Sequence, residues 1–103
     1  MKTNFIEQLI RESNYRVSKY NEENGKKEHF TINVDIKENG GFIMVVGQSV
    51  TREQTPVYER QLAAFNTAQE GGSNAKRRAL VAVKEVYNWI KENKQKINDP
   101  AYI

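Results

Sequence analysis

One stretch of the chain alternates polar and apolar residues without interruption: His29-Phe30-Thr31-Ile32-Asn33-Val34-Asp35-Ile36. Successive side chains of an extended strand point to opposite faces, so the apolar residues of this stretch share one face. The other face is formed by His29, Thr31, Asn33 and Asp35. This pattern predicts a β-strand over residues 29–36 that is buried on one face and solvated on the other.

Two neighbouring segments extend this strand into an antiparallel meander. The tetrapeptide Glu38-Asn39-Gly40-Gly41 predicts a tight hairpin. The segment that follows, Phe42–Val46, is apolar throughout, and we expect it to be a central strand or one covered on both faces. On the N-terminal side, residues 15–20 contain three β-formers and predict a short strand, which the Asn24-Gly25 turn signal separates from the next one.

Helical periodicity appears at both ends of the chain. Thr3 or Asn4 with Glu7 fits a capping box, and the apolar residues that follow it predict an amphipathic helix over residues 4–14. Ser73 is the expected cap of a long helix over residues 74–95, whose apolar arc includes Trp89 as a core residue at its margin. The sequence Asn98-Asp99-Pro100 ends any helix, so residues 97–103 are expected to form a frayed tail.

Residues 52–72 permit more than one structure. Thr55-Pro56 suits the start of a helix, and Tyr58, Leu62 and Phe65 keep helical spacing up to Gly71-Gly72. A short helix is the favoured prediction, with an extra strand or an irregular insertion as alternatives. The expected architecture is a single α+β domain over residues 1–103. It has a three-stranded antiparallel meander, with the N-terminal helix and the long C-terminal helix on one face and a short helix between the third strand and the last helix.

Composition excludes several classes of function. The 103 residues include no Cys and one His, which excludes disulfides, thiolate catalysis and Cys-based zinc sites. His29 with Asp35 falls short of a metal ligand set, and no Ser lies in a nucleophile motif. No apolar run has the length of a membrane span. We therefore expect a soluble, cytoplasmic binding protein without a metal or cofactor, and not an enzyme.

The basic residues are concentrated in the last third of the chain. Residues 73–103 carry seven basic and three acidic side chains, against a net charge of +3 for the whole protein. Lys76, Arg77 and Arg78 lie in the first turn of the last predicted helix, where cations oppose the helix dipole and a bound phosphate would compensate them. Arg77, Lys84 and Lys91 follow at seven-residue spacing, over about 21 Å of helix. A solvated helix face with Glu85 and Glu92 is the alternative interpretation.

The predicted order of elements resembles the double-stranded-RNA-binding domain family. The similarity is carried by Asn4-Phe5-Ile6-Glu7-Gln8-Leu9, by Tyr15 and Val17 leading to Glu23-Asn24-Gly25, by Phe30-Thr31-Ile32-Asn33-Val34, and by Ala75-Lys76-Arg77-Arg78-Ala79-Leu80. In that family the first helix and the loop between the first two strands contact RNA minor grooves, and the start of the last helix holds phosphates. The resemblance implies RNA contacts at Gln8 (or Glu7), at Gly25–His29 with Lys26 and Lys27, and at Lys76–Arg78. The chain departs from the family by its extra segment 52–72 and by the loop Gly25-Lys26-Lys27-Glu28-His29, which lacks the family's proline.

Two functions are therefore expected. The first is binding of RNA or a ribonucleoprotein through the basic start of the last helix. The alternative is an inhibitor or adaptor of the kind carried by phages and mobile elements, which would bind a host protein complex such as a nucleic-acid-guided defence effector. Its contact surface would be either the strand face with His29, Thr31, Asn33 and Asp35, or the segment with Tyr58 and Phe65.

Overall fold

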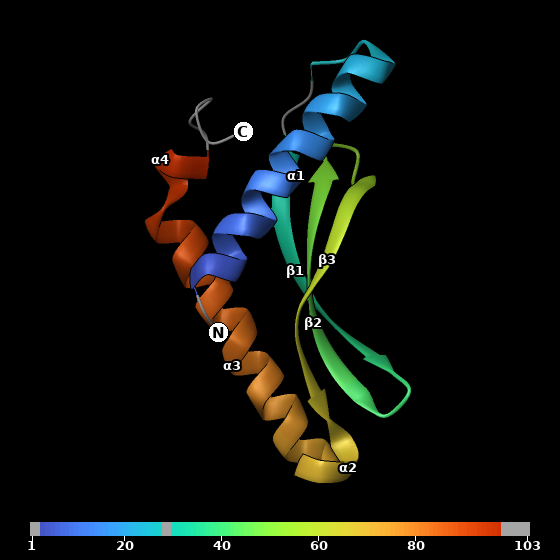
Figure 1. Ribbon diagram of the computed structural model, residues 1–103, viewed down its shortest axis with the longest axis vertical. Coiled ribbons are helices and arrows are strands. Elements are labelled where there is room, and N and C mark those ends of the chain that lie inside the picture. Colours follow the sequence, from blue (N-terminus) through green and yellow to red (C-terminus); the bar gives the residue numbers. More distant parts are fainter. Residues whose placement is uncertain (1–2, 28–29, 98–103) are drawn as a thin grey trace.

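The protein is a three-stranded antiparallel sheet covered on one face by two long helices (Figure 1). The computed structural model describes residues 3–27 and 30–97. The elements follow in the order α1 (Thr3–Asn24), β1 (Phe30–Asn39), β2 (Phe42–Thr51), β3 (Pro56–Asn66), α2 (Thr67–Glu70), α3 (Gly72–Glu92) and α4 (Lys94–Ile97). This confirms the predicted α+β class, the presence of a three-stranded antiparallel meander, and the presence of a short helix before the last long one, although the bounds of two of these elements differ from the predictions.

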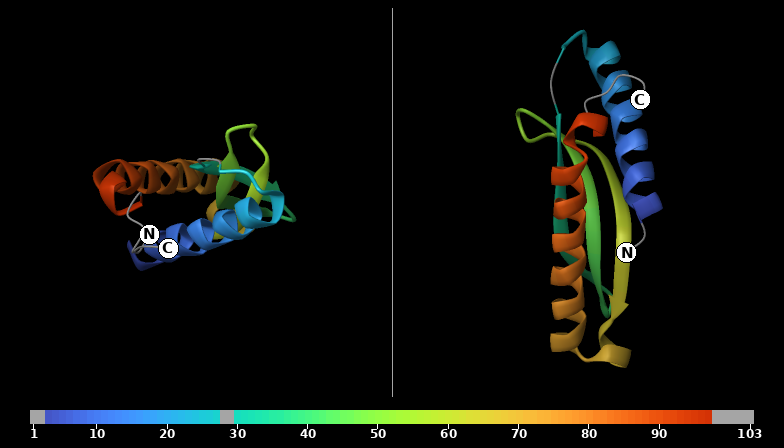
Figure 2. Two further views of the ribbon diagram at one scale, coloured as in Figure 1. Left: turned by 90° about the horizontal axis from the view of Figure 1, so that it is seen from above. Right: turned by 90° about the vertical axis from the view of Figure 1, so that its left-hand side faces the viewer.

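The two helices lie side by side on the same face of the sheet (Figure 2). The sheet has the order β1-β2-β3, so β2 is central as expected. The hairpin between β1 and β2 pairs Asn39 with Phe42 and turns at Gly40 and Gly41, whose φ angles are 54° and 84°. Two central residues with positive φ are the requirement of a two-residue hairpin turn, which explains the paired glycines.

The prediction of a strand over residues 15–20 is wrong, because α1 continues through that segment to Asn24. The buried residues Ile6, Leu9, Ser13 and Val17 are spaced by three and four, so the apolar stripe of the helix continues past residue 14. Packing of this stripe outweighs the β-propensity of the neighbouring tyrosines. The Asn24-Gly25 signal ends the helix instead of joining two strands, and Gly25 adopts a φ of 64°.

The favoured prediction of a helix starting near Pro56 is also wrong, and the alternative of an extra strand is correct. Residues 56–66 form β3, which pairs with β2 along its length. The register shifts between Val45 and Val46, so that β3 carries an extra residue at Leu62. Tyr58 and Leu62 are four positions apart in the sequence, and Leu62 and Phe65 are three positions apart. In a regular strand an odd separation places two side chains on opposite faces, but the bulge brings all three to the face that the helices cover. A bulged strand thereby imitates helical spacing.

The short helix α2 and the start of α3 also differ in detail from the predictions. Asn66 caps α2, because its side-chain oxygen accepts hydrogen bonds from the backbone N–H groups of Ala68 and Gln69. The N-cap of α3 is Gly71, which has no side-chain cap, and Ser73 lies inside the helix. Ile97, the last described residue, contacts the core, and the rest of the predicted frayed tail lies outside the described residues.

Two clusters form the core between the sheet and the helices. The first joins α1 to β1 and α3 through Ile6, Leu9, Ile10, Ile32 and Val86, and Trp89 packs against it as predicted. The buried residues of the second lie on β2 and α3, and half-buried residues of β1 and β3 pack against them; the buried residues are Ile43, Val45, Ala75, Ala79 and Ala82. Outside the core, the Tyr87 hydroxyl of α3 accepts a hydrogen bond from the N–H of Val34 on the edge strand β1 and donates one to its carbonyl.

Gly47 in the central strand lets α1 lie close to the sheet. A Cβ at this position would lie 2.5 Å from Leu9 Cδ2 and 3.2 Å from Leu62 Cδ1. Leu9 is completely buried, so its side chain has little space into which it could move. The absence of a side chain at Gly47 is therefore a packing requirement of the α1–sheet contact.

We predict that Gly47→Ala lowers the free energy of unfolding by about 1–3 kcal/mol, because the added methyl group overpacks a buried site. Urea unfolding followed by circular dichroism measures the change. Gly72→Ala is the matched control, since a Cβ there meets nothing within 4 Å and alanine favours the first turn of α3. An equal effect of the two substitutions would contradict this account of Gly47.

Candidate functional site

The cations predicted to bind RNA along the last helix lie on the outer side of α3. The helix turns Ala75, Ala79, Ala82 and Val86 toward the sheet, and these residues are buried. Arg77, Lys84 and Lys91 are all exposed on the opposite side. We call these three residues the basic ridge. Within the described ranges, no carboxylate forms an ion pair with Lys84 or Lys91.

The three cations in the first turns of α3 have different surroundings. Lys76 is exposed, and Arg77 donates a hydrogen bond to the side chain of Asn74 over 3.2 Å. Arg78 forms an ion pair with Glu70 of α2, and its guanidinium carbon lies 4.7 Å from the centre of the Phe65 ring. Cations at the start of a helix oppose its dipole, and a bound phosphate was expected to compensate them. Glu70 already supplies part of that negative charge.

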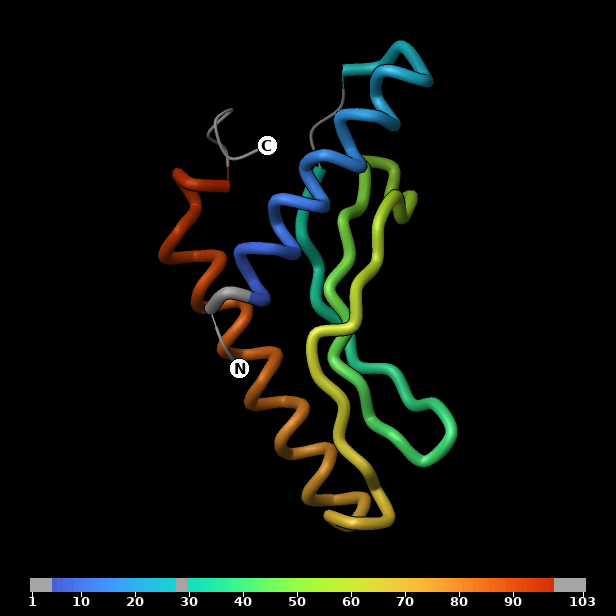
Figure 3. Tube along the Cα trace, in the orientation of Figure 1, coloured from blue at the N-terminus to red at the C-terminus, as the bar shows by residue number. Residues whose placement is uncertain are grey.

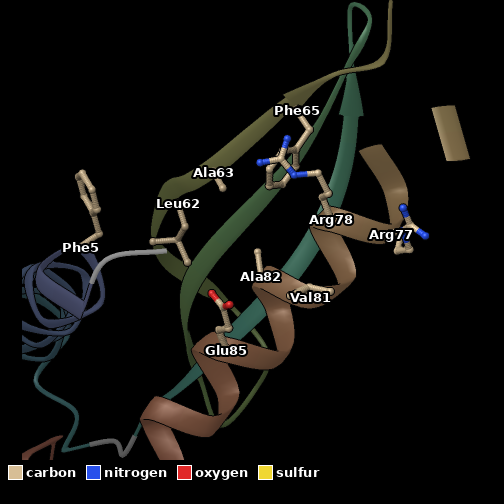
Figure 4. A pocket seen from close by; sticks show the side chains of 9 residues that line it. All are labelled: Phe5, Leu62, Ala63, Phe65, Arg77, Arg78, Val81, Ala82 and Glu85. Atoms are coloured by element: carbon tan, nitrogen blue, oxygen red, sulfur yellow. The ribbon is translucent and has the colours of Figure 1, made fainter. Parts of the chain in front are cut away.

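A groove opens between the start of α1, the second half of β3 and the first half of α3 (Figure 4). Its volume is about 520 Å³. Leu62 and Ala63 of β3 and Ala82 of α3 contribute apolar surface, to which Phe5 and Val81 add exposed side chains at the rim. The remaining lining residues are Phe65, Arg77, Arg78 and Glu85. We refer to this space as the groove.

Charge is distributed unevenly along the groove. Arg77 and Arg78 lie at the end of the groove nearest the N-terminus of α3, and Glu85 lies about 12 Å along the helix at 1.5 Å per residue. Figure 4 shows Arg78 beside Phe65 at one end and Glu85 at the other. The groove is thus apolar in its middle, basic at one end and acidic at the other.

Lys76 lines a second hollow, on the hairpin side of α3. This hollow has a volume of about 470 Å³ and lies between Lys76, the β1–β2 turn and Thr67. Thr67 links the start of α2 to the β1–β2 turn, because its hydroxyl donates a hydrogen bond of 2.8 Å to the carbonyl of Gly41. Lys76 and Arg77 therefore belong to different hollows although they are adjacent in the sequence.

The RNA contacts implied by family resemblance do not come together in one place. Lys26 and Lys27 follow the end of α1, at the opposite end of the molecule from the start of α3 (Figure 3). The segment Gly25–His29 joins α1 to β1 and does not connect two strands, so the residue-by-residue correspondence with the family loop is wrong. Gln8 contacts its own protein: it accepts a hydrogen bond from Arg60 and donates one to Glu12.

The residues predicted for a protein partner are divided between the two faces of the sheet. Thr31, Asn33 and Asp35 lie on the face away from the helices, because they alternate with the core-facing residues of β1. On the helix side, Tyr58 donates a hydrogen bond to Glu12, and Phe65 packs beneath Arg78. His29 lies outside the described residues. The described members of the two sets therefore lie on different surfaces.

An ion pair crosses the open face of the sheet. Lys37 of β1 and Glu59 of β3 approach to 2.8 Å, and Gln48 of β2 also donates a hydrogen bond to Glu59. These hydrogen bonds, the one from Lys37 first, lower the pKa of Glu59. Lys37 is opposite Met44 and Glu59 is opposite Gln48, so both are diagonal neighbours of Val46, which is only 3% exposed. The pair therefore belongs to the packing of the sheet.

Tyr58, Glu12 and Arg60 form a polar contact between α1 and β3 that sequence patterns did not reveal. Arg60 Nη1 lies 2.9 Å from Glu12 Oε2, and the same carboxylate accepts the Tyr58 hydroxyl. The hydrogen bond from Tyr58, assisted by Arg60, lowers the pKa of Glu12 against the opposing effect of burial. Burial and, after it, the hydrogen bond to Glu12 raise the pKa of Tyr58. Both shifts favour a neutral tyrosine paired with a charged glutamate.

We predict that Tyr58→Phe lowers the free energy of unfolding by about 1 kcal/mol at neutral pH, through the lost hydrogen bond. Because the pKa of Glu12 is lowered in the folded protein, its contribution is present above the ordinary glutamate pKa of about 4.3 and is lost as pH falls through the lowered value. The difference between wild type and variant in urea unfolding should therefore shrink from about pH 7 to about pH 3. Tyr15→Phe, on the exposed side of α1, should change nothing. A difference that is the same at both pH values would contradict the Tyr58–Glu12 link.

Within residues 3–27 and 30–97, no group of three or more His, Asp or Glu side chains is placed to hold a metal ion. Over the same ranges, the helices lack the combination of length and apolar character needed to cross a membrane. The surface features that the structure shows are the basic ridge on the outside of α3 and the groove beside it. No protein-family model, curated protein or solved structure matches this chain.

Proposed function

We propose that this protein is a non-catalytic RNA-binding domain whose basic ridge contacts the phosphate backbone. The observation that carries the proposal is the exposure of Arg77, Lys84 and Lys91 along the outer side of α3. Lys84 and Lys91 have no ion-pair partner among the described residues. Their charges are therefore available to displace counterions from a polyanion, which is the main source of affinity in such complexes.

Duplex RNA is the form of nucleic acid that the arrangement favours. The α-β-β-β-α order resembles the domains that recognise A-form RNA by shape, in which the start of the last helix contacts phosphates. The ridge has a length of about 21 Å at 1.5 Å per residue, enough to contact several phosphates along one strand. Sequence-independent binding with a strong salt dependence is the expected behaviour.

The test replaces the ridge by Arg77→Ala, Lys84→Ala and Lys91→Ala in one variant. Affinity for a fluorescent RNA duplex, measured by anisotropy at two salt concentrations, should fall at least about tenfold, and the salt dependence should become weaker by about one unit of log–log slope per cation removed. Arg78 is left unchanged, because it pairs with Glu70 and packs on Phe65.

A matched control removes the same charge from the other end of the molecule, with Lys26→Ala, Lys27→Ala and Arg52→Ala. Lys26 and Lys27 follow α1, and Arg52 lies in the turn between β2 and β3. We expect this variant to keep most of the affinity. Equal losses in the two variants would contradict a contact at the ridge, and failure of the wild-type protein to bind duplex RNA, duplex DNA and single strands would overturn the proposal.

A protein-binding adaptor or inhibitor is the second candidate function. The observation in its favour is the groove, because Phe5 and Val81 are about half exposed beside apolar floor residues. Exposed apolar side chains gathered around a concave site are typical of surfaces that bind another protein. A complex with a protein partner should survive nuclease treatment, whereas one held together by RNA should not.

A further inference from the structure

We propose that the groove binds an acidic amphipathic helix of a partner protein, with the acidic residues of that helix at the end marked by Arg77. This inference rests on the second candidate function, and it names the chemistry of the partner. The groove shares Arg77 with the ridge, but Lys84 and Lys91 of the ridge do not line the groove, and Val81 of the groove does not belong to the ridge. The two binding activities can therefore be tested separately.

The size and lining of the groove suit side chains of a helix. A volume of about 520 Å³ lies within the usual range of ligand sites. Leu62, Ala63 and Ala82 provide a floor of aliphatic carbon, and Phe5 and Val81 supply rims from two different helices. An amphipathic helix places apolar side chains at three- and four-residue spacing into such a groove. The 12 Å between Arg77 and Glu85 corresponds to about two turns of the bound helix.

Charge determines which helix fits. Arg77 is exposed at the end nearest the start of α3, where its only described hydrogen bond is to the neutral side chain of Asn74. A carboxylate on the partner would complement this cation. Because Arg77 lies at only one end of the groove, the acidic residues of the partner belong on one side of its apolar residues.

The same features argue against nucleic acid as the occupant of the groove. Arg78 is already paired with Glu70, which reduces the positive charge that the groove offers to a phosphate. The floor consists of aliphatic side chains, which offer no aromatic face for a base, and Phe5, the exposed aromatic residue of the lining, lies at the rim. Phe65, the aromatic residue beside the floor, is covered by the Arg78 guanidinium.

The probe is a synthetic, end-capped helical peptide with leucines at three- and four-residue spacing. In one half of this peptide, every position that is not a leucine is a glutamate. Its fluorescein-labelled form should bind the full-length protein in an anisotropy titration. A twin peptide with lysine in place of each glutamate should bind at least tenfold more weakly. Absence of binding of the acidic peptide up to millimolar concentration, or equal binding of both peptides, would overturn the proposal.

Adjacent residues of α3 provide a matched pair of variants. Leu80 and Val81 are both 53% exposed, but only Val81 lines the groove. Val81→Glu should weaken peptide binding at least tenfold, whereas Leu80→Glu, which adds the same charge one residue away, should change it less than twofold. Circular dichroism checks that both variants fold. Equal losses in the two variants would overturn the assignment to the groove.

A titration of the same variants with the RNA duplex separates this inference from the first proposed function. If Val81→Glu loses peptide binding and keeps RNA binding, the result supports the groove as an independent site. If Val81→Glu binds the peptide as tightly as the wild-type protein does, the groove proposal is overturned and the ridge proposal is unaffected. Displacement of the bound peptide by RNA would show that nucleic acid occupies the groove, and would overturn the choice of a protein partner.

Discussion

The contact of Leu9 with Gly47 holds α1 against the central strand, and the positions of the other elements follow from it. Leu9 is fully buried where a side chain on β2 would exclude it. Among the described residues, α1 contributes to one of the two core clusters. The buried residues of the other lie on β2 and α3, and half-buried residues of β1 and β3 pack against them. The groove is the space beside this second cluster, and among the residues whose side chains are described Phe5 is the one that α1 contributes to its lining.

The bulge in β3 determines what the groove contains. One extra residue between the partners of Val45 and Val46 brings Leu62 to the helix side together with Ala63. In a regular strand, neighbouring residues point to opposite faces, and one of these two would lie on the open face. Bulges commonly redirect side chains next to binding sites in this way. The apolar floor thus depends on a local irregularity of the sheet.

The sequence predicted the elements whose signals are local. The alternating stretch that contains Ile32 and Val34, the Gly40-Gly41 hairpin and the apolar arc of α3 are all found where expected. Errors arose where tertiary packing outweighs local propensity. Val17 joins the buried stripe of α1 in spite of its β-forming neighbours, and the bulge at Leu62 gives a strand the spacing of a helix.

The candidate site was predictable only in part for the same reason. The seven-residue spacing of Arg77, Lys84 and Lys91 is a property of one helix, and their exposure is confirmed. The groove joins Phe5, Leu62 and Val81 from three separate elements, so no local pattern could reveal it. The pairing of Arg78 with Glu70, which accounts for part of the conspicuous charge at the start of α3, likewise depends on the turn between α2 and α3.

The hydrogen bonds between Tyr87 and Val34 bear on how the protein behaves at high concentration. An edge strand offers unpaired N–H and carbonyl groups on which a strand from another molecule can add. On β1 the Tyr87 hydroxyl occupies both groups of Val34, and the carboxylate of Asp35 accepts the N–H of Ile36. Two successive pairing positions on this edge are thereby blocked by the protein's own side chains. A three-stranded sheet with one uncovered face is in this way protected from growing by strand addition along β1.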